Sequence, residues 1–434
     1  MNPDEPCALK PYPTKLIVET TTRCNLSCPM CMKNTCQDLF HEADMDEQTF
    51  HALLPALKSA EVLVLNGIGE PLLNQHLEEF ITLARSTMPQ TSLIGFQSNG
   101  FLMDENRAIR LIDSGLDRVC ISIDAVDPEG FRLIRKGGDL SGIQAAVKAL
   151  RMARMKTRSN FLIGIEFVLR KDNLHELPGT ISWAGENGVD FAIVTQLFPY
   201  HPDLVSQALY DSNIDVSVDI FREFSRIAAR EGLDLRAYRN AYMHYTTSAE
   251  DMRVKKLVES MLEKALSSGV SMNLQRLFAM DDSWHEKTAD IFEKARKAAS
   301  VTGMDLRLPG IIPRSMRRCE FVEEGCTFVT VDGGIHPCYF LWHRYRCYIG
   351  GVEKAVAPKC FGNLRERGIL EIWNDKAYTT FRRNVLRYDY PFCFNCSFAL
   401  CDYVQGEDFE QDCYINAETC AVCLWCMDIF GCLK

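Results

Sequence analysis

The sequence predicts an α/β fold built on a partial, TIM-like (β/α)6 barrel, followed by a helical insertion and a cysteine-rich C-terminal domain. Three observations lead to this prediction. Six short apolar runs alternate with amphipathic stretches between Lys15 and Pro199, a charged region with helical spacing follows, and cysteines crowd the chain from Cys319 onward. Strands that alternate with helices form a parallel sheet, and right-handed crossovers curl such a sheet into an open barrel. We expect domains at residues 1–204, 205–312 and 313–434.

The individual elements follow from the hydrophobic pattern. The predicted strands are 16–19, 61–65, 92–97, 118–123, 162–169 and 191–195, and the predicted intervening helices are 46–59, 77–86, 105–114, 142–153 and 176–187. Apolar positions at helical spacing predict insertion helices at 216–231, 251–268 and 283–303. The last region shows a strand at 327–331, a helix at 370–386 and no conventional apolar core, which is typical of small metal-stapled folds. In a barrel of this kind, the active site lies at the C-terminal ends of the strands.

Composition excludes several classes of protein. The net charge of −10 argues against nucleic-acid binding, which needs a basic face. The strongest apolar stretch, residues 161–169, is strand-sized and interrupted by Glu166, so we expect no membrane span. The N-terminus has no basic region leading into an apolar one, and we therefore expect a cytoplasmic protein. In that compartment, the 19 cysteines are expected to be metal ligands rather than disulfides.

The first cysteine group follows the first predicted strand. Cys24, Cys28 and Cys31 have the spacing C-x3-C-x2-C. Three thiolates can hold three irons of a 4Fe-4S cluster and leave the fourth iron open, whereas an electron-transfer cluster takes a fourth cysteine. An open iron can chelate the amino and carboxylate groups of a methionine moiety. Two alternatives stay open at this point: a zinc knuckle and an electron-transfer cluster, each with Cys36 as the fourth ligand.

Polar motifs stand at the ends of the next strands. Residues 66–71, Asn-Gly-Ile-Gly-Glu-Pro, end the second strand, and their carboxylate suits a cationic ammonium group. An ordinary turn is the alternative, and a dinucleotide fingerprint is excluded because Leu72 stands in place of its third glycine. Ser98 and Asn99 end the third strand. Ser122 and Asp124 end the fourth.

The cysteine motif and the strand-end motifs together resemble the radical S-adenosylmethionine (SAM) superfamily. The resemblance implies a catalytic 4Fe-4S cluster on Cys24, Cys28 and Cys31 and a SAM site formed by Met30, Gly69, Glu70, Ser98, Asn99, Ser122, Asp124, Arg135 and Leu197. In the family, the glycine–glutamate motif binds the methionine amino group, while the serine and arginine contact ribose and carboxylate. Met30 stands where the family usually has an aromatic residue near adenine, and Leu197 matches another position that packs on adenine. Ile68 replaces the first glycine of the family's glycine pair.

The second cysteine group begins Cys319-x6-Cys326-x11-Cys338 and continues Cys393-x2-Cys396-x4-Cys401. It resembles the SPASM extension of radical SAM enzymes, which binds two auxiliary 4Fe-4S clusters. The candidate ligands are Cys319, Cys326, Cys338, Cys393, Cys396, Cys401, Cys413, Cys420, Cys423 and Cys432. Position 405, where the pattern expects a cysteine, is Gln, so Cys413 is the expected substitute. A different cluster count and a zinc ribbon on the two C-x2-C pairs at 393–396 and 420–423 stay open.

The resemblance implies a protein, peptide or enzyme-cofactor substrate and reduced ferredoxin or flavodoxin as electron donor. Only about 15 residues precede the barrel, so we expect no leader-binding domain. Tyr339 stands where the sulfatase-maturing branch has a catalytic aspartate. Residues 338–343, the insertion and the extra cysteines are similar to a maturase group associated with tungsten-dependent aldehyde ferredoxin oxidoreductases. The alternatives are a radical SAM enzyme that acts on a small metabolite and a non-catalytic iron–sulfur electron carrier.

Overall fold

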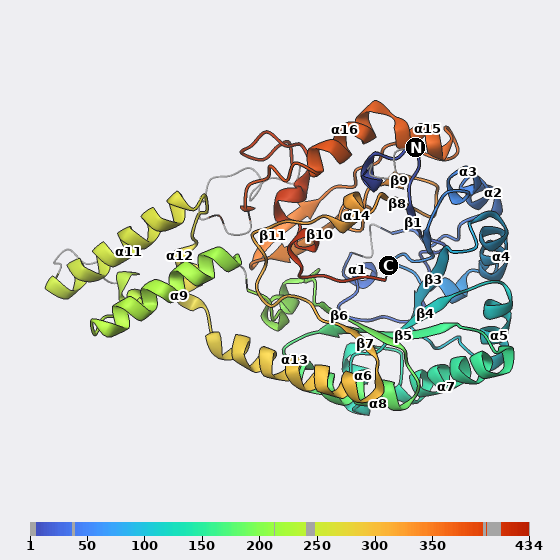
Figure 1. Ribbon diagram of the computed structural model, residues 1–434, viewed down its shortest axis with the longest axis horizontal. Coiled ribbons are helices and arrows are strands. Elements are labelled where there is room, and N and C mark those ends of the chain that lie inside the picture. The colour runs from blue at the N-terminus through green and yellow to red at the C-terminus, as the bar shows by residue number, and fades with distance from the viewer. Residues whose placement is uncertain are drawn as a thin grey trace.

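The computed structural model describes residues 6–36, 40–211, 213–239, 248–393, 396 and 409–433. Six consecutive parallel strands form the predicted partial barrel, with the order β1-β2-β3-β4-β5-β6 in one sheet (Figure 1). These strands are β1 Lys15–Val18, β2 Val62–Val64, β3 Leu93–Ser98, β4 Arg118–Ser122, β5 Leu162–Leu169 and β6 Phe191–Gln196. Every residue of β1, β4 and β6 is buried, as in a sheet covered on both faces. The predicted fold class is confirmed.

Segments from beyond the barrel extend the sheet to nine strands. The short strand β7 (Asp305–Arg307) pairs with β6, and β8 (Cys326–Val329) pairs in parallel with β1 in the register Leu16↔Thr327. Strand β9 (Ile335–His336) then pairs antiparallel with β8. The end of the insertion and the start of the C-terminal region therefore share one sheet with the barrel. The domain boundaries themselves stay a prediction.

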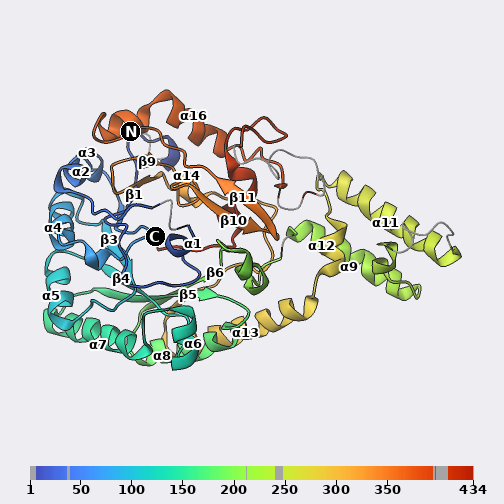
Figure 2. The same ribbon diagram turned by 180° about the vertical axis from the view of Figure 1, so that it is seen from behind.

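Helices cover the outer face of the sheet (Figures 1 and 2). They are α2 Glu47–His51, α3 Leu54–Leu57, α4 Leu77–Thr87, α5 Glu105–Asp113, α6 Pro128–Ile134, α7 Leu140–Thr157 and α8 Leu177–Glu186. Aspartates begin several of them: Asp104 accepts a hydrogen bond from the Arg107 amide at 2.7 Å, and Asp139 accepts one from the Gly142 amide at 3.0 Å. Each carboxylate satisfies a backbone donor that the first helical turn leaves unpaired.

The insertion forms an arm that projects from the barrel (Figures 1 and 2). It contains α9 Asp215–Arg230, α11 Ala249–Ser267 and α12 Leu274–Ala279, and α13 (Asp282–Thr302) then packs against α8. Helix α11 begins with a capping box, in which Ser248 and Asp251 exchange hydrogen bonds. Helix α13 ends at Gly303, whose φ of 73° suits glycine. None of the helices in the described residues is long and apolar enough to cross a membrane.

The C-terminal region has an apolar core, contrary to the sequence-based expectation. Its regular elements are α14 Glu320–Glu323, the hairpin β10 Tyr345–Ile349 and β11 Val352–Val356, and the helices α15 Ile369–Asn374 and α16 Lys376–Val385. Tyr378 is fully buried and stacks on Phe361 with ring centroids 4.0 Å apart. The Trp373 indole donates to the Lys10 carbonyl at 2.9 Å, which fastens the N-terminal segment to this core. The pattern was missed because aromatic residues, rather than periodic aliphatic ones, fill the core.

Candidate functional site

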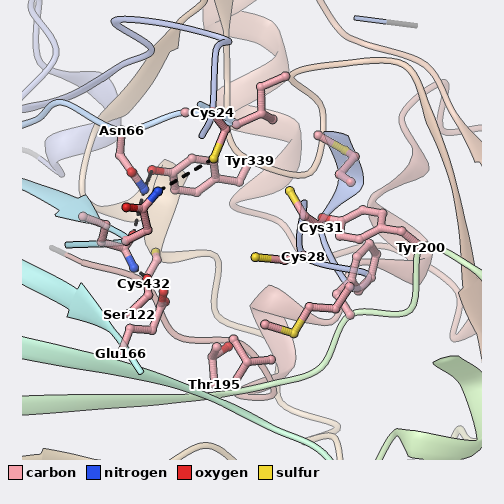
Figure 3. A pocket seen from close by; sticks show the side chains of 18 of the residues that line it. Cys24, Cys28, Cys31, Asn66, Ser122, Glu166, Thr195, Tyr200, Tyr339 and Cys432 are labelled. Carbon is pink, nitrogen blue, oxygen red and sulfur yellow. Dashed lines mark hydrogen bonds between the residues drawn. The ribbon is translucent and has the colours of Figure 1, made fainter. Parts of the chain in front are cut away.

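The three cysteines of the first motif lie between β1 and the short helix α1 (Met32–Thr35). The Cys31 amide donates to the Cys28 carbonyl at 3.0 Å, and the Asn34 side chain donates to the same carbonyl at 3.1 Å. Figure 3 shows all three sulfurs around one cavity. Burial raises the pKa of Cys24 and raises that of Cys31 to about 11. A metal would therefore have to displace the thiol protons, as iron and zinc do on binding.

A buried carboxylate stands next to this loop. Glu70 accepts hydrogen bonds from the Ser98 hydroxyl at 2.8 Å and from the Asn99 amide at 2.7 Å. Burial raises the pKa of Glu70, while these donors act in the opposite direction. A positively charged group of a bound ligand next to Glu70 would favour the ionised carboxylate further.

Gly69 brings this carboxylate close to the cysteine loop. A Cβ at Gly69 would lie 2.3 Å from the carbonyl oxygen of Thr21, so only glycine allows the two loops to meet. The Glu70 amide donates to the Arg23 carbonyl at 2.7 Å and fixes the contact. The Asn99 side-chain amide lies 3.9 Å from the Cys24 sulfur, which joins the third strand to the same site.

Ser122 and Arg135 line the cavity from the fourth strand and the helix that follows it. The Arg135 Nε donates to the Asp124 carboxylate at 2.5 Å, and Asp124 also accepts from the Val168 amide at 2.7 Å. Asp124 is fully buried and does not itself line the cavity. It holds the guanidinium of Arg135 in place, with the fork available for an anionic group.

Met30 and Leu197 meet in a small apolar cluster apart from the main core. Ile134 and Leu204 complete it, and Val168 packs against it. Met30 and Leu197 both line the cavity, although they lie far apart in the chain. A flexible thioether and a branched aliphatic side chain form a surface suited to the face of a planar ring.

The cavity that these groups enclose has a volume of about 340 Å³. Its lining includes the three motif cysteines, Gly69, Glu70, Ser98 and Asn99, together with Ser122, Arg135, Met30 and Leu197. The structure therefore brings together every residue that the sequence analysis placed at the SAM site except Asp124, which acts through Arg135.

Sequence reasoning missed a polar wall of this cavity. The Asn66 amide donates to Gln97 at 2.7 Å and to the Tyr339 hydroxyl at 3.2 Å, and the Gln97 amide donates to the Glu166 carboxylate. Figure 3 shows Asn66, Tyr339 and Glu166 across the cavity from Cys28 and Cys31. Burial raises the pKa of Glu166 to about 7. The charged interruption of a buried apolar strand was the signal that could have identified Glu166.

The C-terminal tail closes the cavity. Trp425, Phe430 and Cys432 line it, and the Gly431 amide donates to the Thr195 hydroxyl of β6 at 3.2 Å. Cys432 was predicted to be an auxiliary-cluster ligand. The structure places it beside Glu166 on the wall opposite Cys28 and Cys31 (Figure 3). It is thus the C-terminal cysteine found in the lining of this cavity.

Four other C-terminal cysteines gather behind this tail. Burial raises the pKa of Cys319, Cys338 and Cys420, and neighbouring thiols in this group, Cys423 among them, raise it further. Cys319 precedes α14 and Cys338 follows β9. Cys420 lies within a 3-10 turn, Thr419–Val422, and Cys423 directly follows it. The Arg318 amide donates to the Cys426 carbonyl at 2.7 Å, which fastens the tail next to Cys319. We call Cys319, Cys338, Cys420 and Cys423 the thiol quartet.

The remaining predicted ligands differ in burial. Cys326 is 1% exposed within β8, and its thiol lies 3.8 Å from the Thr327 carbonyl. Cys393 and Cys396 are half-buried and Cys413 is exposed. Cys401 lies outside the described residues. A second auxiliary cluster on these cysteines stays a prediction.

The spacing of the thiols bears on which metal they fit. With Zn–S bonds of about 2.3 Å, tetrahedral zinc draws its sulfurs to within about 4 Å of one another. Among the described residues, the only group of three or more Cys, His, Asp or Glu ligands with donor atoms all within 4.8 Å is Glu47, His76 and Glu79 at the surface. Neither cysteine group is drawn together as one zinc ion would require. In an iron–sulfur cluster each thiolate binds a different iron, so its thiols need not approach one another that closely.

Two family models match the chain. Residues 18–184 match the model of the radical SAM superfamily, and residues 319–397 match that of SPASM, an iron–sulfur cluster-binding domain. The first match contains the three motif cysteines and the strand-end residues. The second contains Cys319 and Cys338 but ends before Cys420.

Two curated relatives are informative. The tungsten-containing aldehyde ferredoxin oxidoreductase cofactor-modifying protein of Pyrococcus furiosus is 29% identical over 426 residues, which cover 96% of each chain. The PqqA peptide cyclase of Gluconobacter oxydans is 31% identical over 177 residues, 41% of this chain and 47% of the relative.

A solved structure shares the fold. The crystal structure of Streptococcus suis SuiB bound to S-adenosylmethionine superposes with a TM-score of 0.52 and 13% identity, covering 89% of this chain and 71% of that one. Radical SAM domains use a 4Fe-4S cluster and SAM, and the cysteine loop, Glu70 and the cavity have the residues that these cofactors need. From its motifs, its cavity and both family matches, the chain carries a radical SAM domain followed by a C-terminal SPASM domain.

Proposed function

We propose that the protein reductively cleaves SAM at a cluster held by Cys24, Cys28 and Cys31 and abstracts hydrogen from a substrate in the adjoining cavity. One observation carries the proposal: three thiols open onto a cavity that Glu70 also lines. The fourth cysteine of the lining, Cys432, lies on the opposite wall and leaves the three-thiol site incomplete (Figure 3). A site with three thiolates keeps one iron available for a ligand.

The residues of the chain then divide the work of holding SAM. Glu70 accepts the ammonium of the methionine moiety, because its carboxylate is buried and already oriented by Ser98 and Asn99. Arg135, oriented by Asp124, takes the carboxylate. Met30 and Leu197 form the apolar surface for adenine. When bound, the cluster supplies the electron that converts SAM into methionine and a 5′-deoxyadenosyl radical.

We further propose that the thiol quartet holds one auxiliary 4Fe-4S cluster. Burial raises the pKa of Cys319, Cys338 and Cys420, and neighbouring thiols of the quartet raise it further. Cys426 donates to the Cys423 carbonyl at 3.0 Å and also lowers the pKa of the Cys423 thiol by hydrogen bonding. It therefore acts as a hydrogen-bond donor to a ligand. Cys326 is assigned to the core.

The proposed biological role is the maturation of a protein, a peptide or an enzyme cofactor. The similarity over nearly the whole chain to a protein named for modifying the cofactor of a tungsten-containing aldehyde ferredoxin oxidoreductase supports this role. The polar wall of Asn66, Gln97, Glu166 and Tyr339 gives the substrate hydrogen-bonding partners beside the radical site. Reduced ferredoxin or flavodoxin is the proposed electron donor, and the cytoplasm the proposed location.

The first experiment tests SAM cleavage. Anaerobically reconstituted protein with dithionite and SAM is expected to release 5′-deoxyadenosine, measured by liquid chromatography and mass spectrometry. Cys28→Ala should release none, and Cys120→Ala, which changes a buried thiol in β4, should retain the activity. Undiminished product from Cys28→Ala contradicts the proposal. A non-catalytic electron carrier would bind iron but show no SAM-induced change in the EPR spectrum of its reduced cluster.

The second experiment separates substrate classes. Deuterated apo-oxidoreductase of the tungsten aldehyde ferredoxin type, its free cofactor and a panel of deuterated metabolites are each incubated with the reduced protein and SAM. Deuterium in 5′-deoxyadenosine identifies the source of the abstracted hydrogen. Transfer from the oxidoreductase or its cofactor supports maturation, and transfer from a metabolite alone contradicts it. Replacing dithionite with reduced ferredoxin or flavodoxin tests the electron donor.

A further inference from the structure

A buried arginine lies against the thiol quartet. Arg317 is 7% exposed and directly precedes Arg318 and Cys319 in the chain. Its guanidinium donates to the Tyr390 carbonyl at 2.7 Å and to the Ala421 carbonyl at 3.2 Å. It also lies 4.4 Å from the centre of the Phe392 ring. One side chain thus contacts the segment before Cys393 and the turn that carries Cys420.

The charge of Arg317 has no acidic partner in the part of the chain that the structure describes. All of its hydrogen bonds there go to backbone carbonyls, and its Nε, which is shielded from solvent, has no partner. A guanidinium stays ionised in proteins, so it cannot relieve the cost of burial by losing its proton. An unpaired buried charge costs several kcal/mol. A bound anionic group would supply the missing compensation.

The thiols nearby show where that group belongs. The Arg317 guanidinium donates to the carbonyl of Ala421, which lies between Cys420 and Cys423 in the chain, and Arg317 itself stands two residues before Cys319. Arg318, its neighbour, points the other way: its side chain is 70% exposed and pairs with Glu323 at 2.9 Å. Two adjacent arginines therefore differ in burial, in charge partner and in their relation to the quartet.

We propose that Arg317 balances the negative charge of the auxiliary cluster on the thiol quartet and thereby sets its reduction potential. The inference rests on the proposed ligand role of the quartet. Four thiolates around a 4Fe-4S core leave a net negative charge, which grows by one when the cluster is reduced. A nearby buried cation stabilises the reduced state more than the oxidised one, because the low dielectric of the interior screens the interaction weakly. Arg317 thus makes the auxiliary cluster a better electron acceptor.

The test uses the full chain with Cys24, Cys28 and Cys31 all changed to Ala, so that only auxiliary clusters remain. Iron and sulfide are counted, and midpoint potentials are measured by anaerobic redox titration followed by EPR. In this background, Cys423→Ala identifies the wave that belongs to the quartet. Arg317→Met should lower the one-electron reduction equilibrium constant of that wave at least tenfold, a shift of about 59 mV to more negative potential. Arg318→Gln is the matched control and should shift nothing.

Arg317→Lys separates charge from shape. Lysine keeps the positive charge but loses the planar fork, so its wave should stay closer to the wild-type potential than that of Arg317→Met. If Arg317→Met binds no iron, a lysine variant with full iron and a near wild-type potential still supports the inference. A lysine variant that fails in the same way overturns it, because the fork and not the charge is then required.

Different outcomes contradict the ligand role of the quartet and the role of Arg317. Full iron and unchanged waves in Cys423→Ala would contradict the ligand role of the quartet. A wave that Cys423→Ala removes but Arg317→Met leaves unshifted would contradict the role of Arg317 alone.

Discussion

The two cysteine regions of this protein differ in what surrounds the thiols. Cys24, Cys28 and Cys31 face a cavity of about 340 Å³ that is lined by polar and apolar side chains from the barrel and the tail. The thiol quartet lies behind the tail, where backbone hydrogen bonds such as that from Arg318 to Cys426 fasten the chain around it. Three ligands beside a cavity leave an iron that can bind a reactant, and four enclosed ligands do not.

Arg135 and Arg317, which lie next to the two cysteine regions, also differ in their surroundings. Arg135 beside the radical site is ion-paired with Asp124 at 2.5 Å. Its net charge is therefore largely compensated, and it serves to orient a ligand. Arg317 beside the quartet donates only to carbonyls within the described residues, and its charge remains available to the cluster. Arg135 contributes to the first site by its fixed position, whereas Arg317 contributes to the second by its uncompensated charge, which affects the reduction potential.

The largest expected effect comes from removing one cysteine ligand from each of the two regions in turn. Cys31→Ala should abolish 5′-deoxyadenosine formation and remove one cluster's iron while the quartet cluster remains. Cys420→Ala should remove a different cluster and leave SAM cleavage with dithionite measurable. Iron analysis, EPR and product chromatography on the same preparations check both. Loss of SAM cleavage in Cys420→Ala to the level of Cys31→Ala would merge the two sites into one functional unit.

Glu70→Gln should weaken SAM binding without removing iron. Removing the charge of a buried carboxylate that accepts an ammonium loses about 1.5–3 kcal/mol, which is roughly a ten- to hundredfold rise in Kd. Glu42→Gln is the matched control, because Glu42 is an exposed carboxylate that pairs with Lys33 at 2.7 Å near the same loop. The measurement is SAM binding to the reconstituted protein by isothermal titration. Equal affinity in Glu70→Gln and wild type would place the ammonium elsewhere.

The residues of the proposed radical site were easier to group from the sequence than those of the thiol quartet, for a physical reason. Strand ends of a parallel sheet converge at one edge, so Glu70, Ser98 and Ser122 could be assigned to one cavity from local motifs. The quartet depends on a tail that folds back across more than 80 residues from Cys338, and cysteine spacing does not specify such a return. The ligand role predicted for Cys326 stays a prediction, and the structure adds that this residue pairs with Lys15 within the sheet.

The stability of the protein should depend on pH through Glu166 in the polar wall of the radical site. Burial raises the pKa of Glu166 from 4.5 to about 7, with Arg135 lowering it and Asp124 raising it. The contribution of Glu166 to the free energy of unfolding is fully present below about pH 4.5. It falls by up to roughly 3 kcal/mol as the pH rises to about 7 and the buried carboxyl loses its proton. Denaturation midpoints of the iron-loaded protein across this range should fall for wild type and stay flatter for Glu166→Gln. Parallel profiles would show that Glu166 titrates as an ordinary surface carboxylate.

The smallest expected effect is at Cys326, where the sequence pattern and the structure lead to different roles. Cys326→Ala should keep the full iron content and the potential of the quartet cluster, because the thiol lies within β8 opposite Lys15 of β1 and is assigned to the core. Loss of the buried sulfur should lower the stability by about 1 kcal/mol, as for other small deletions from a packed core. Cys319→Ala, the nearby ligand variant, should lose the iron instead. Iron analysis and thermal denaturation of the two variants distinguish packing from ligation, and equal iron loss in both would return Cys326 to the cluster.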